Sequence, residues 1–492
     1  MQPPLPGDRS RAVAVVNVLE SRRAGHRPRW QGIAPARPID RASQTTGTGS
    51  TLASARDRMH ANQRRRAGRI AVALVGVAGV LLISRSGALA PRDSTERVVE
   101  RVVERGRGPV PASYVGLHIH HAGAGTAWPS AAFASWRLWD AYVAWPWLEP
   151  SRGAWQWEIA DRLVTLAGEH QIEVLLPLGL SPTWASARPT EPSAYGRPGL
   201  SAEPADLGDW RRYVETVASR YAGRVHLYEI WNEPNLAEFY TGDVAAMVRL
   251  CREAYAIVKR IDPAARVVSP AATGAAGVPW LDRFLAAGGA GCFDVVGFHF
   301  YVMPDAAETI VPLIARVQDV MQARGVGARP LWNTETGWYV ARAPHAAGAD
   351  HPGALSESLA AATVARALVL ARAAGVERFY WYAWDNENTG LADRDGVARA
   401  PGRALAEVER WLVGAQLDGC RRVSSGAWLC GLTREGRGQW IVWHPGGRAD
   451  LPNPPRWRIA TRRDLGGTVQ PVRADAPTIE IGPAPQLLEP RP

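Results

Sequence analysis

Cysteine is scarce in this chain, whose 492 residues include only four. Four are too few for a scaffold built on disulfides, and none stands in a CxxC pair or a Cys/His cluster with zinc-ligand spacing, which excludes that class of metal site. Cys420 and Cys430 flank a plausible hairpin. We expect a disulfide between them if the body lies outside the cytoplasm, and two thiols otherwise. Cys251 and Cys292 are expected to be buried thiols.

The chain also lacks an excess of charge beyond its first 69 residues. The formal net charge is +10, and residues 1–69 supply all of it, with 14 arginines against four acids. The remainder holds 43 basic and 43 acidic side chains. Nucleic-acid enzymes carry their basic surface on the folded domain, so no nucleic-acid partner is expected for the body. We interpret 1–69 as a disordered basic tail, whose binding to anionic lipid or nucleic acid is a lesser alternative function.

One long uncharged run follows the tail. As a helix, Ile70–Ile83 would span about 21 Å, short of the ~30 Å hydrocarbon core of a bilayer. Extension to residues 70–90 gives 21 residues, in which Arg85 is the only charge. The basic cluster Arg64–Arg69 predicts an N-terminus that stays inside and a body that is exported. We therefore predict a single-pass protein of the cytoplasmic membrane, with its body in the periplasm or outside the cell.

The same segment has an alternative interpretation as a cleaved signal peptide, with Ala88–Ala90 as the A-x-A site. Translation from Met59 would favour cleavage. Pro91 follows the site directly and should obstruct the peptidase. We favour an uncleaved signal-anchor, whereas cleavage would make the protein secreted.

Residues 91–112 are predicted to form a helical stalk or linker. Within TERVVERVVERG the apolar side chains share one helical face, and Glu and Arg occupy the others. These apolar residues are Val98, Val99, Val102 and Val103. Pro109 and Pro111 are expected to end the helix.

From residue 113 to 414, short apolar runs alternate with segments of helical period. Such alternation predicts parallel strands, and eight units close into a (β/α)₈ barrel. A doubly wound sheet is the structural alternative, but no Gly-rich phosphate motif follows the first run. Residues 415–492 show strand and turn patterns and predict a small β-sandwich-like accessory domain. The expected strands are 114–119, 136–139, 173–178, 226–231, 266–269, 294–300, 330–334 and 378–384. The expected helices are 160–170, 209–221, 244–261, 279–287, 309–323, 357–374 and 402–413.

Two of the expected strands have a glutamate just past their ends. The fourth ends in YEIWNEPN, which contains Glu233, and the seventh in LWNTETGW, which contains Glu335. Functional residues of barrels lie at these carboxyl ends. A buried glutamate is costly without a partner or a role. Two carboxyl groups that converge there suit glycosidic bond cleavage, in which one protonates the leaving oxygen and the other attacks the anomeric carbon or activates water.

At these motifs the sequence from about residue 114 to 414 resembles a clan A glycoside hydrolase, closest to family 39 and similar to its membrane-anchored bacterial endoglycosidases. YEIWNEPN resembles the acid/base signature and WNTETGW the nucleophile signature. RLWDAYVAWPWLEPSRGAWQW resembles the second-strand region and GFHFY the sixth. The resemblance implies retaining hydrolysis, with Glu233 as acid/base, Glu335 as nucleophile and Asn232 as partner of the sugar 2-hydroxyl.

The resemblance implies three further site residues. Arg137 stands where the clan has an arginine that supports the nucleophile; a structural salt bridge is the alternative. Tyr301 resembles the tyrosine that hydrogen-bonds the nucleophile, and a tyrosine at the rim is the alternative. Trp384 stands where a tryptophan floor lies under the reacting sugar, with core packing as the alternative.

Other candidates depend on position alone. His118 and His299 face the barrel mouth if strand alternation holds; otherwise they are core histidines. Trp184, in SPTWAS after the third strand, is either a sugar platform or a packing residue. Glu229 and Glu149 are expected to be structural, the latter by ordering a loop.

We therefore expect a retaining glycosidase that needs no metal or organic cofactor and acts on a polysaccharide or oligosaccharide, preferably as an endo-enzyme on a cell-envelope or exported glycan. An exo-acting enzyme of the β-xylosidase or iduronidase type is the first alternative. A non-catalytic glycan-binding protein of an exopolysaccharide assembly system is the second.

Overall fold

The computed structural model describes residues 98–102, 108–122, 126–341, 350–393 and 395–491. The predicted tail and the predicted membrane segment at 70–90 lie outside these residues. Among the helices that are described, none is both long and apolar enough to cross a bilayer.

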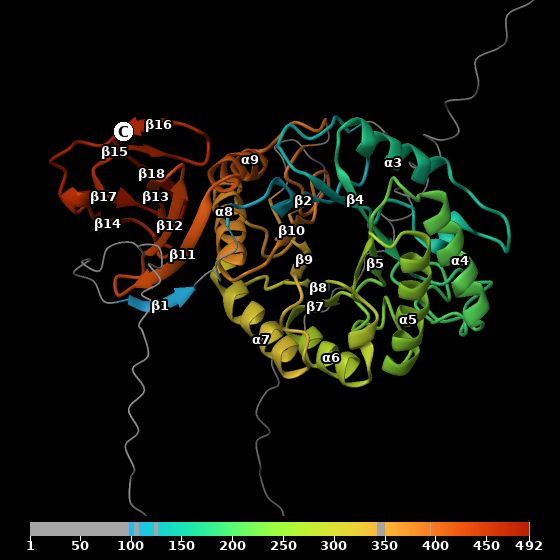
Figure 1. Ribbon diagram of the computed structural model, residues 1–492. Coiled ribbons are helices and arrows are strands. Elements are labelled where there is room, and N and C mark those ends of the chain that lie inside the picture. The colour runs from blue at the N-terminus through green and yellow to red at the C-terminus, as the bar shows by residue number, and fades with distance from the viewer. Residues whose placement is uncertain (1–97, 103–107, 123–125, 342–349, 394, 492) are drawn as a thin grey trace, which may run out of the picture. The chain divides into compact units, whose positions relative to one another are not determined.

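The larger part of the described chain is a parallel sheet that closes into a barrel (Figure 1). Its order is β6-β5-β4-β3-β2-β10-β9-β8-β7. A parallel bridge between Val268 and Val295 joins the ends of the sheet, because β6 and β7 are two pieces of one barrel strand. This arrangement fits the predicted (β/α)₈ fold. The strands are β2 (Val115–Leu117), β3 (Ser135–Arg137), β4 (Glu173–Leu178), β5 (Leu227–Ile230), β6 (Arg266–Val268), β7 (Ala272–Thr273), β8 (Val296–His299), β9 (Leu331–Thr336) and β10 (Arg378–Trp381).

The helices surround this sheet, and several begin at side chains that cap them. Asp243 accepts a hydrogen bond from the backbone N–H of Ala246 at the start of α5, and Asp206 caps α4 in the same way. The helices are α2 (Trp145–Leu148), α3 (Glu158–Glu169), α4 (Leu207–Arg220), α5 (Val244–Ile261), α6 (Gly274–Ala286), α7 (Ile310–Ala323), α8 (Glu357–Ala373) and α9 (Ala400–Leu412). Short 3₁₀ turns are η1 (Ala112–Tyr114), η2 (Gly289–Gly291), η3 (Ala307–Thr309) and η4 (Pro455–Trp457).

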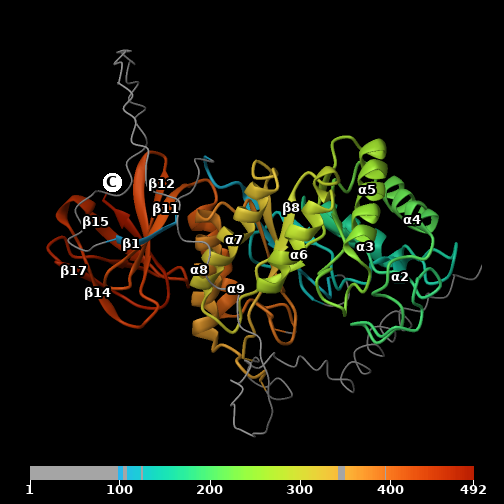
Figure 2. The same cartoon turned by 90° about the horizontal axis from the view of Figure 1, so that it is seen from below.

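The C-terminal region is a separate set of antiparallel strands beside α8 and α9 (Figure 2). Its larger sheet has the order β1-β11-β12-β13-β18-β15-β16, and β14 pairs with β17. Leu451 and Ile479 of the small sheet share one apolar cluster with Val442 and Leu488 of the large one. The strands are β11 (Gln416–Val423), β12 (Trp428–Arg434), β13 (Arg437–Trp443), β14 (Ala449–Pro452), β15 (Ile459–Arg463), β16 (Val469–Pro471), β17 (Thr478–Ile481) and β18 (Gln486–Pro490).

The helical stalk is a wrong prediction over the residues that can be seen. Residues Val98–Val102 form strand β1, which pairs antiparallel with β11, so that Val102 stands opposite Cys420. Branched valines favour strands, and the edge of β11 offers hydrogen-bond partners that an isolated helix lacks. The described valines that would share one face of a helix therefore lie in a strand of the accessory sheet.

The cysteines are paired differently from the prediction in one case. Cys420 and Cys430 form the expected disulfide across β11 and β12. Cys251 and Cys292, expected to be thiols, are also bridged, with their Cα atoms 5.6 Å apart. Cys251 lies on α5 and Cys292 follows η2, and both are fully buried. Their separation of 41 residues hides a proximity that only the packing of the fold creates.

Candidate active site

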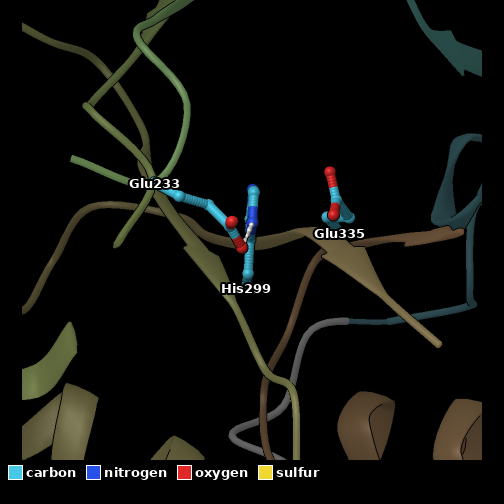
Figure 3. Close-up of side chains that lie close together, drawn as sticks. All are labelled: Glu233, His299 and Glu335. Atoms are coloured by element: carbon cyan, nitrogen blue, oxygen red, sulfur yellow. Dashed lines mark hydrogen bonds and ion pairs between the residues drawn. The ribbon is translucent and has the colours of Figure 1, made fainter. Parts of the chain in front are cut away.

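The fold brings Glu233 and Glu335 together at the carboxyl ends of the barrel strands. Glu335 lies in β9, and Glu233 follows β5 with a left-handed backbone (φ 43°). A non-glycine residue in that conformation is typical of constrained functional positions. One ligand atom each of Glu233, His299 and Glu335 lies within 4.8 Å of the others. Figure 3 shows the His299 ring between the two carboxyl groups, and the residues Glu233 and Glu335 are each 6% exposed.

A buried arginine organises the Glu335 side of the site. The Arg137 guanidinium, 0% exposed at the end of β3, donates to Glu335 Oε2 at 2.7 Å and to Asn232 Oδ1 at 2.7 Å. It also pairs with Glu229. Burial opposes its charge, but these two carboxylates outweigh the burial and raise the Arg137 pKa above its ordinary value. Glu229 is therefore structural, as expected: it helps to fix the arginine that holds Glu335.

Two further groups contact Glu335. Tyr301 donates its hydroxyl to Oε1 at 3.0 Å, and burial together with the Glu335 charge raises the Tyr301 pKa, so this donor keeps its proton. His118 Nε2 lies 3.7 Å from Oε2. Its Nδ1 faces the carbonyl oxygen of Trp381 at 3.2 Å, which can only accept, so Nδ1 carries the proton and Nε2 accepts from Arg137 at 3.0 Å. Burial and the Arg137 charge lower the His118 pKa and keep it neutral.

The Glu233 side has no cation in direct contact. Its Oε1 lies 3.0 Å from His299 Nδ1. Burial lowers the His299 pKa to about 4, so the ring is neutral near pH 7. Burial raises the pKa of Glu233 to about 7, against a lowering by a hydrogen bond to Thr273 and by the Arg137 charge.

Burial raises the Glu335 pKa to about 7 as well, and the Glu233 charge adds to this rise, so the two carboxyl groups titrate as a coupled pair. Arg137 and Tyr301 donate directly to Glu335, whereas Glu233 faces a neutral ring. The first proton of the pair therefore resides on Glu233, and the negative charge on Glu335. This is the division of protonation that an acid and a nucleophile require.

Glu233, His299 and Glu335 also have the geometry to offer three ligand atoms to a metal ion. Arg137 already pairs with Glu335, so a cation there would stand beside a buried guanidinium. That charge opposes the binding of a divalent ion. The donor set fits proton transfer better than metal ligation.

The structure gathers seven of the predicted residues at this place and leaves two away from it. Trp384 is 0% exposed and belongs to the core, which contradicts the prediction of a sugar floor. Trp184 donates to the Glu149 carbonyl at 2.9 Å, and the guanidinium groups of Arg152 and Arg212 lie over its ring. The Trp184 ring is therefore occupied by packing instead of serving as a free platform. The residues brought together are Glu233, Glu335, Asn232, Arg137, His118, His299 and Tyr301.

Glu149 lies below this packing and has the structural role expected of it. Its carboxylate accepts from Trp145 Nε1 at 2.8 Å, from the backbone of Gly153 at 2.7 Å and from Arg212 at 2.6 Å. These bonds order the loop after α2.

Two residues at the site were missed from the sequence. Tyr382, directly after β10, packs edge-on against His118, with ring centroids 5.2 Å apart. Its hydroxyl donates to Asp140 Oδ2 at 2.7 Å, and Asp140 follows β3. Strand parity does not separate Tyr382 from Trp384, because the two residues are two positions apart; the difference is that β10 already ends at Trp381, which puts Tyr382 at the mouth.

Part of the chain is similar in sequence to known proteins. Residues 208–409 match a family described as glycosyl hydrolase catalytic core. A β-xylosidase of Caldicellulosiruptor saccharolyticus is 29% identical over 144 residues, which cover 26% of this chain and 29% of that protein. The chain spans less than a third of the length of the curated relatives that it matches.

Solved structures share the fold. A family 39 glycoside hydrolase of Bacteroides cellulosilyticus aligns with a TM-score of 0.62 at 18% identity, over 77% of this chain and 81% of that one. A family 39 β-xylosidase of Caulobacter crescentus aligns with a TM-score of 0.56 at 18% identity, over 79% and 99%. Residues 208–409 therefore match a glycosyl hydrolase catalytic core, and the chain shares its fold with these family 39 structures.

Proposed function

We propose that this chain is a retaining glycoside hydrolase in which Glu335 is the nucleophile and Glu233 the general acid and base. The observation that carries the proposal is the proximity of the two carboxyl groups, which offer oxygens within 4.8 Å of each other. Retaining enzymes hold their carboxyl groups roughly 5–5.5 Å apart, whereas inverting enzymes need about 6.5–9.5 Å to admit a water molecule. The separation of these oxygens lies below the ~6.5 Å at which inverting pairs begin, which favours a retaining pair.

The reaction follows from the protonation of the pair. Glu335, ionised and held by Arg137, attacks the anomeric carbon while Glu233 donates its proton to the departing glycosidic oxygen. The C–O bond to the leaving group breaks as the bond to Glu335 forms. This ester removes the negative charge of Glu335, which lowers the Glu233 pKa. Glu233 then takes a proton from water, whose oxygen displaces Glu335 and gives a product with the original anomeric configuration.

The substrate that we propose is a β-linked polysaccharide of the cell envelope or an exported glycan, cleaved internally. The alternative is an exo-acting enzyme of the β-xylosidase type. Two similar proteins support it, because the relative from Caldicellulosiruptor and the structure from Caulobacter are both named β-xylosidases. The chain length of the products distinguishes the endo-acting enzyme from the exo-acting one. Incubation with xylan and with bacterial exopolysaccharide should release a ladder of oligosaccharides from an endo-enzyme; release of single sugars alone would establish the exo alternative.

We propose a location outside the cytoplasm, anchored through residues 70–90. Two disulfides among the described residues support an oxidising compartment. A reporter fused after Arg107 tests the topology, and activity only in the cytoplasm would contradict it. Alkylation and mass spectrometry of exported protein should find no free thiol at Cys251, Cys292, Cys420 or Cys430.

The catalytic assignment is tested by removing the nucleophile. Glu335→Ala should abolish hydrolysis of any glycoside that the parent cleaves, and added azide should restore turnover with an inverted glycosyl azide as the product. Glu253→Ala is the matched control, because Glu253 is a glutamate on α5 whose partner is Arg211, away from the site. Full activity of Glu335→Ala, or azide rescue with retention, would contradict the assignment.

A further inference from the structure

A third carboxyl group lies beside the catalytic pair and has no place in the mechanism above. Asp140 follows β3, is half-buried, and adopts a left-handed backbone with φ 56°. Its Oδ1 accepts from the Tyr195 hydroxyl at 2.8 Å and its Oδ2 from the Tyr382 hydroxyl at 2.7 Å. Among the described residues, no basic side chain forms an ion pair with Asp140. Two neutral donors thus hold its carboxylate in place and leave its charge uncompensated.

The contacts of Asp140 place it on one side of the reacting centre. Tyr382, its partner, packs against His118, and His118 contacts Arg137 and Glu335. The charge of Asp140 reaches both catalytic groups, since it raises the pKa of Glu233 and of Glu335. Asp140 is therefore a neighbour of the pair although it contacts neither directly.

The side on which Asp140 lies decides which sugar it faces. Glu233 and its partner His299 come from β5 and β8, so the leaving group departs on that side of the barrel. Asp140 and Tyr382 come from the ends of β3 and β10, beyond His118 at the end of β2. Because β8 and β10 flank β9 on opposite sides, Asp140 lies on the side away from the leaving group, toward which the glycone ring extends from an anomeric carbon held between the two carboxyl groups.

The support of Asp140 is rigid. Tyr195 packs against three aromatic rings, those of Trp139, Trp147 and Phe239, with centroids 6.3, 5.2 and 6.2 Å away. A carboxylate has about four acceptor positions, and the two tyrosines use two of them. The remaining positions can accept hydrogen bonds from sugar hydroxyls with little loss of side-chain entropy, because the group is already fixed.

We propose that Asp140 is a specificity-determining residue that accepts a hydrogen bond from a hydroxyl group of the glycone sugar and selects neutral sugars over uronic acids. The selection has a simple electrostatic basis, because a uronate would bring a second negative charge toward an uncompensated carboxylate. This inference rests on the proposed glycosidase function and names the class of sugar at that same site. It argues against the iduronidase-like alternative.

The test compares the parent with Asp140→Asn on 4-nitrophenyl β-glycosides of glucose, xylose and glucuronic acid, offered as mono- and disaccharides. The parent should prefer the neutral glycosides. The variant should lose about 10- to 100-fold in kcat/KM on them, the range for a hydrogen bond to a charged group. The ratio of kcat/KM on the glucoside to kcat/KM on the glucuronide should fall by about tenfold or more, because the asparagine no longer repels the uronate.

Deoxy substrates distinguish recognition from a structural role. One of the 3-deoxy and 4-deoxy glucosides should lack the hydroxyl group that Asp140 binds. On that substrate the parent and Asp140→Asn should have nearly equal kcat/KM, because the interaction is already absent. Asp161→Asn is the matched control: Asp161 also accepts from a tyrosine, Tyr221, but it lies on α3 and pairs with Arg220. Its kcat/KM values should stay at the parent level.

Two outcomes would overturn different statements. An equal loss on every glycoside, deoxy substrates included, or an unchanged preference between glucoside and glucuronide, would contradict the role of Asp140. A parent that hydrolyses none of these glycosides, nor any polysaccharide tested, would contradict the proposed function and this inference with it. A melting temperature measured for each variant shows whether the isosteric change has disturbed the fold.

Discussion

The two halves of the site contain the same residue type at the same burial and still differ in charge. Glu233 and Glu335 are each 6% exposed, and burial raises the pKa of both. Glu335 receives hydrogen bonds from a guanidinium and a phenol, whereas Glu233 faces a neutral imidazole. The hydrogen-bond partners of the two carboxyl groups, rather than their burial, therefore decide which group holds the shared proton. That group is the acid, and the ionised one is the nucleophile.

The largest effect that separates the halves should come from Glu233→Ala. Loss of the general acid should lower kcat/KM by about 10²–10⁴-fold on substrates with sugar leaving groups. The loss should be much smaller on 2,4-dinitrophenyl glycosides, whose leaving group needs no proton. Azide should rescue this variant with retained stereochemistry, opposite to Glu335→Ala. The same loss on both classes of leaving group would break the assignment of the two halves.

Removal of the cation from the Glu335 half should be nearly as damaging and should also affect folding. Arg137→Gln leaves Glu335 and Glu229 buried without their shared partner, so the free energy of unfolding should fall by about 3–5 kcal/mol. Denaturant unfolding at pH 7 measures it. Arg137→Lys should not restore kcat/KM, because a single ammonium cannot reproduce the fork that also binds Asn232. Parent-like activity in the lysine variant would show that charge alone suffices.

The Tyr301 hydroxyl tunes the same half more gently. Its hydrogen bond stabilises ionised Glu335 and so lowers the Glu335 pKa. Tyr301→Phe should therefore raise that pKa, and the acid limb of the kcat/KM profile should move to higher pH. A loss of about tenfold at the optimum is expected for one hydrogen bond to a charged group. A shift of the basic limb instead would place the tyrosine with the wrong carboxyl group.

His299 should give the smallest effect, on the opposite limb. Activity should fall as pH rises through about 7, where Glu233 loses its proton. In the His299 tautomer that carries its proton on Nε2, protonated Glu233 donates to Nδ1, and this bond helps to hold the Glu233 proton. His299→Leu should lower the Glu233 pKa and move the basic limb to lower pH. Movement of both limbs together would show that the carboxyl groups do not divide the proton as the contacts indicate.

Much of this site could be predicted because its signals are local. The helix expected at 244–261 has those same bounds as α5, between a capping aspartate and a charged C-terminus. Glu233 and Glu335 each stand at the end of an apolar run, where a carboxyl group is conspicuous. Barrel geometry then brings such ends together from distant parts of the chain.

The errors concern contacts that the local sequence does not contain. Cys251 meets Cys292 only after α5 packs against the segment before β8, and β1 is a strand only because β11 offers an edge. Trp384 is the last residue of the strand expected at 378–384, where the resemblance implies a sugar floor, but β10 ends three residues earlier, at Trp381, and Trp384 is buried. Asp140 was missed because the tyrosines that hold it come from two other loops.

The stereochemistry of the first-formed product tests the central claim most directly. Proton NMR of the parent enzyme acting on a β-linked substrate, recorded before mutarotation, distinguishes the anomers of the released sugar. With carboxyl oxygens of Glu233 and Glu335 within 4.8 Å of each other, the first product should be the β-anomer. Initial release of the α-anomer would mean inversion and would contradict the assignment of Glu335 as nucleophile.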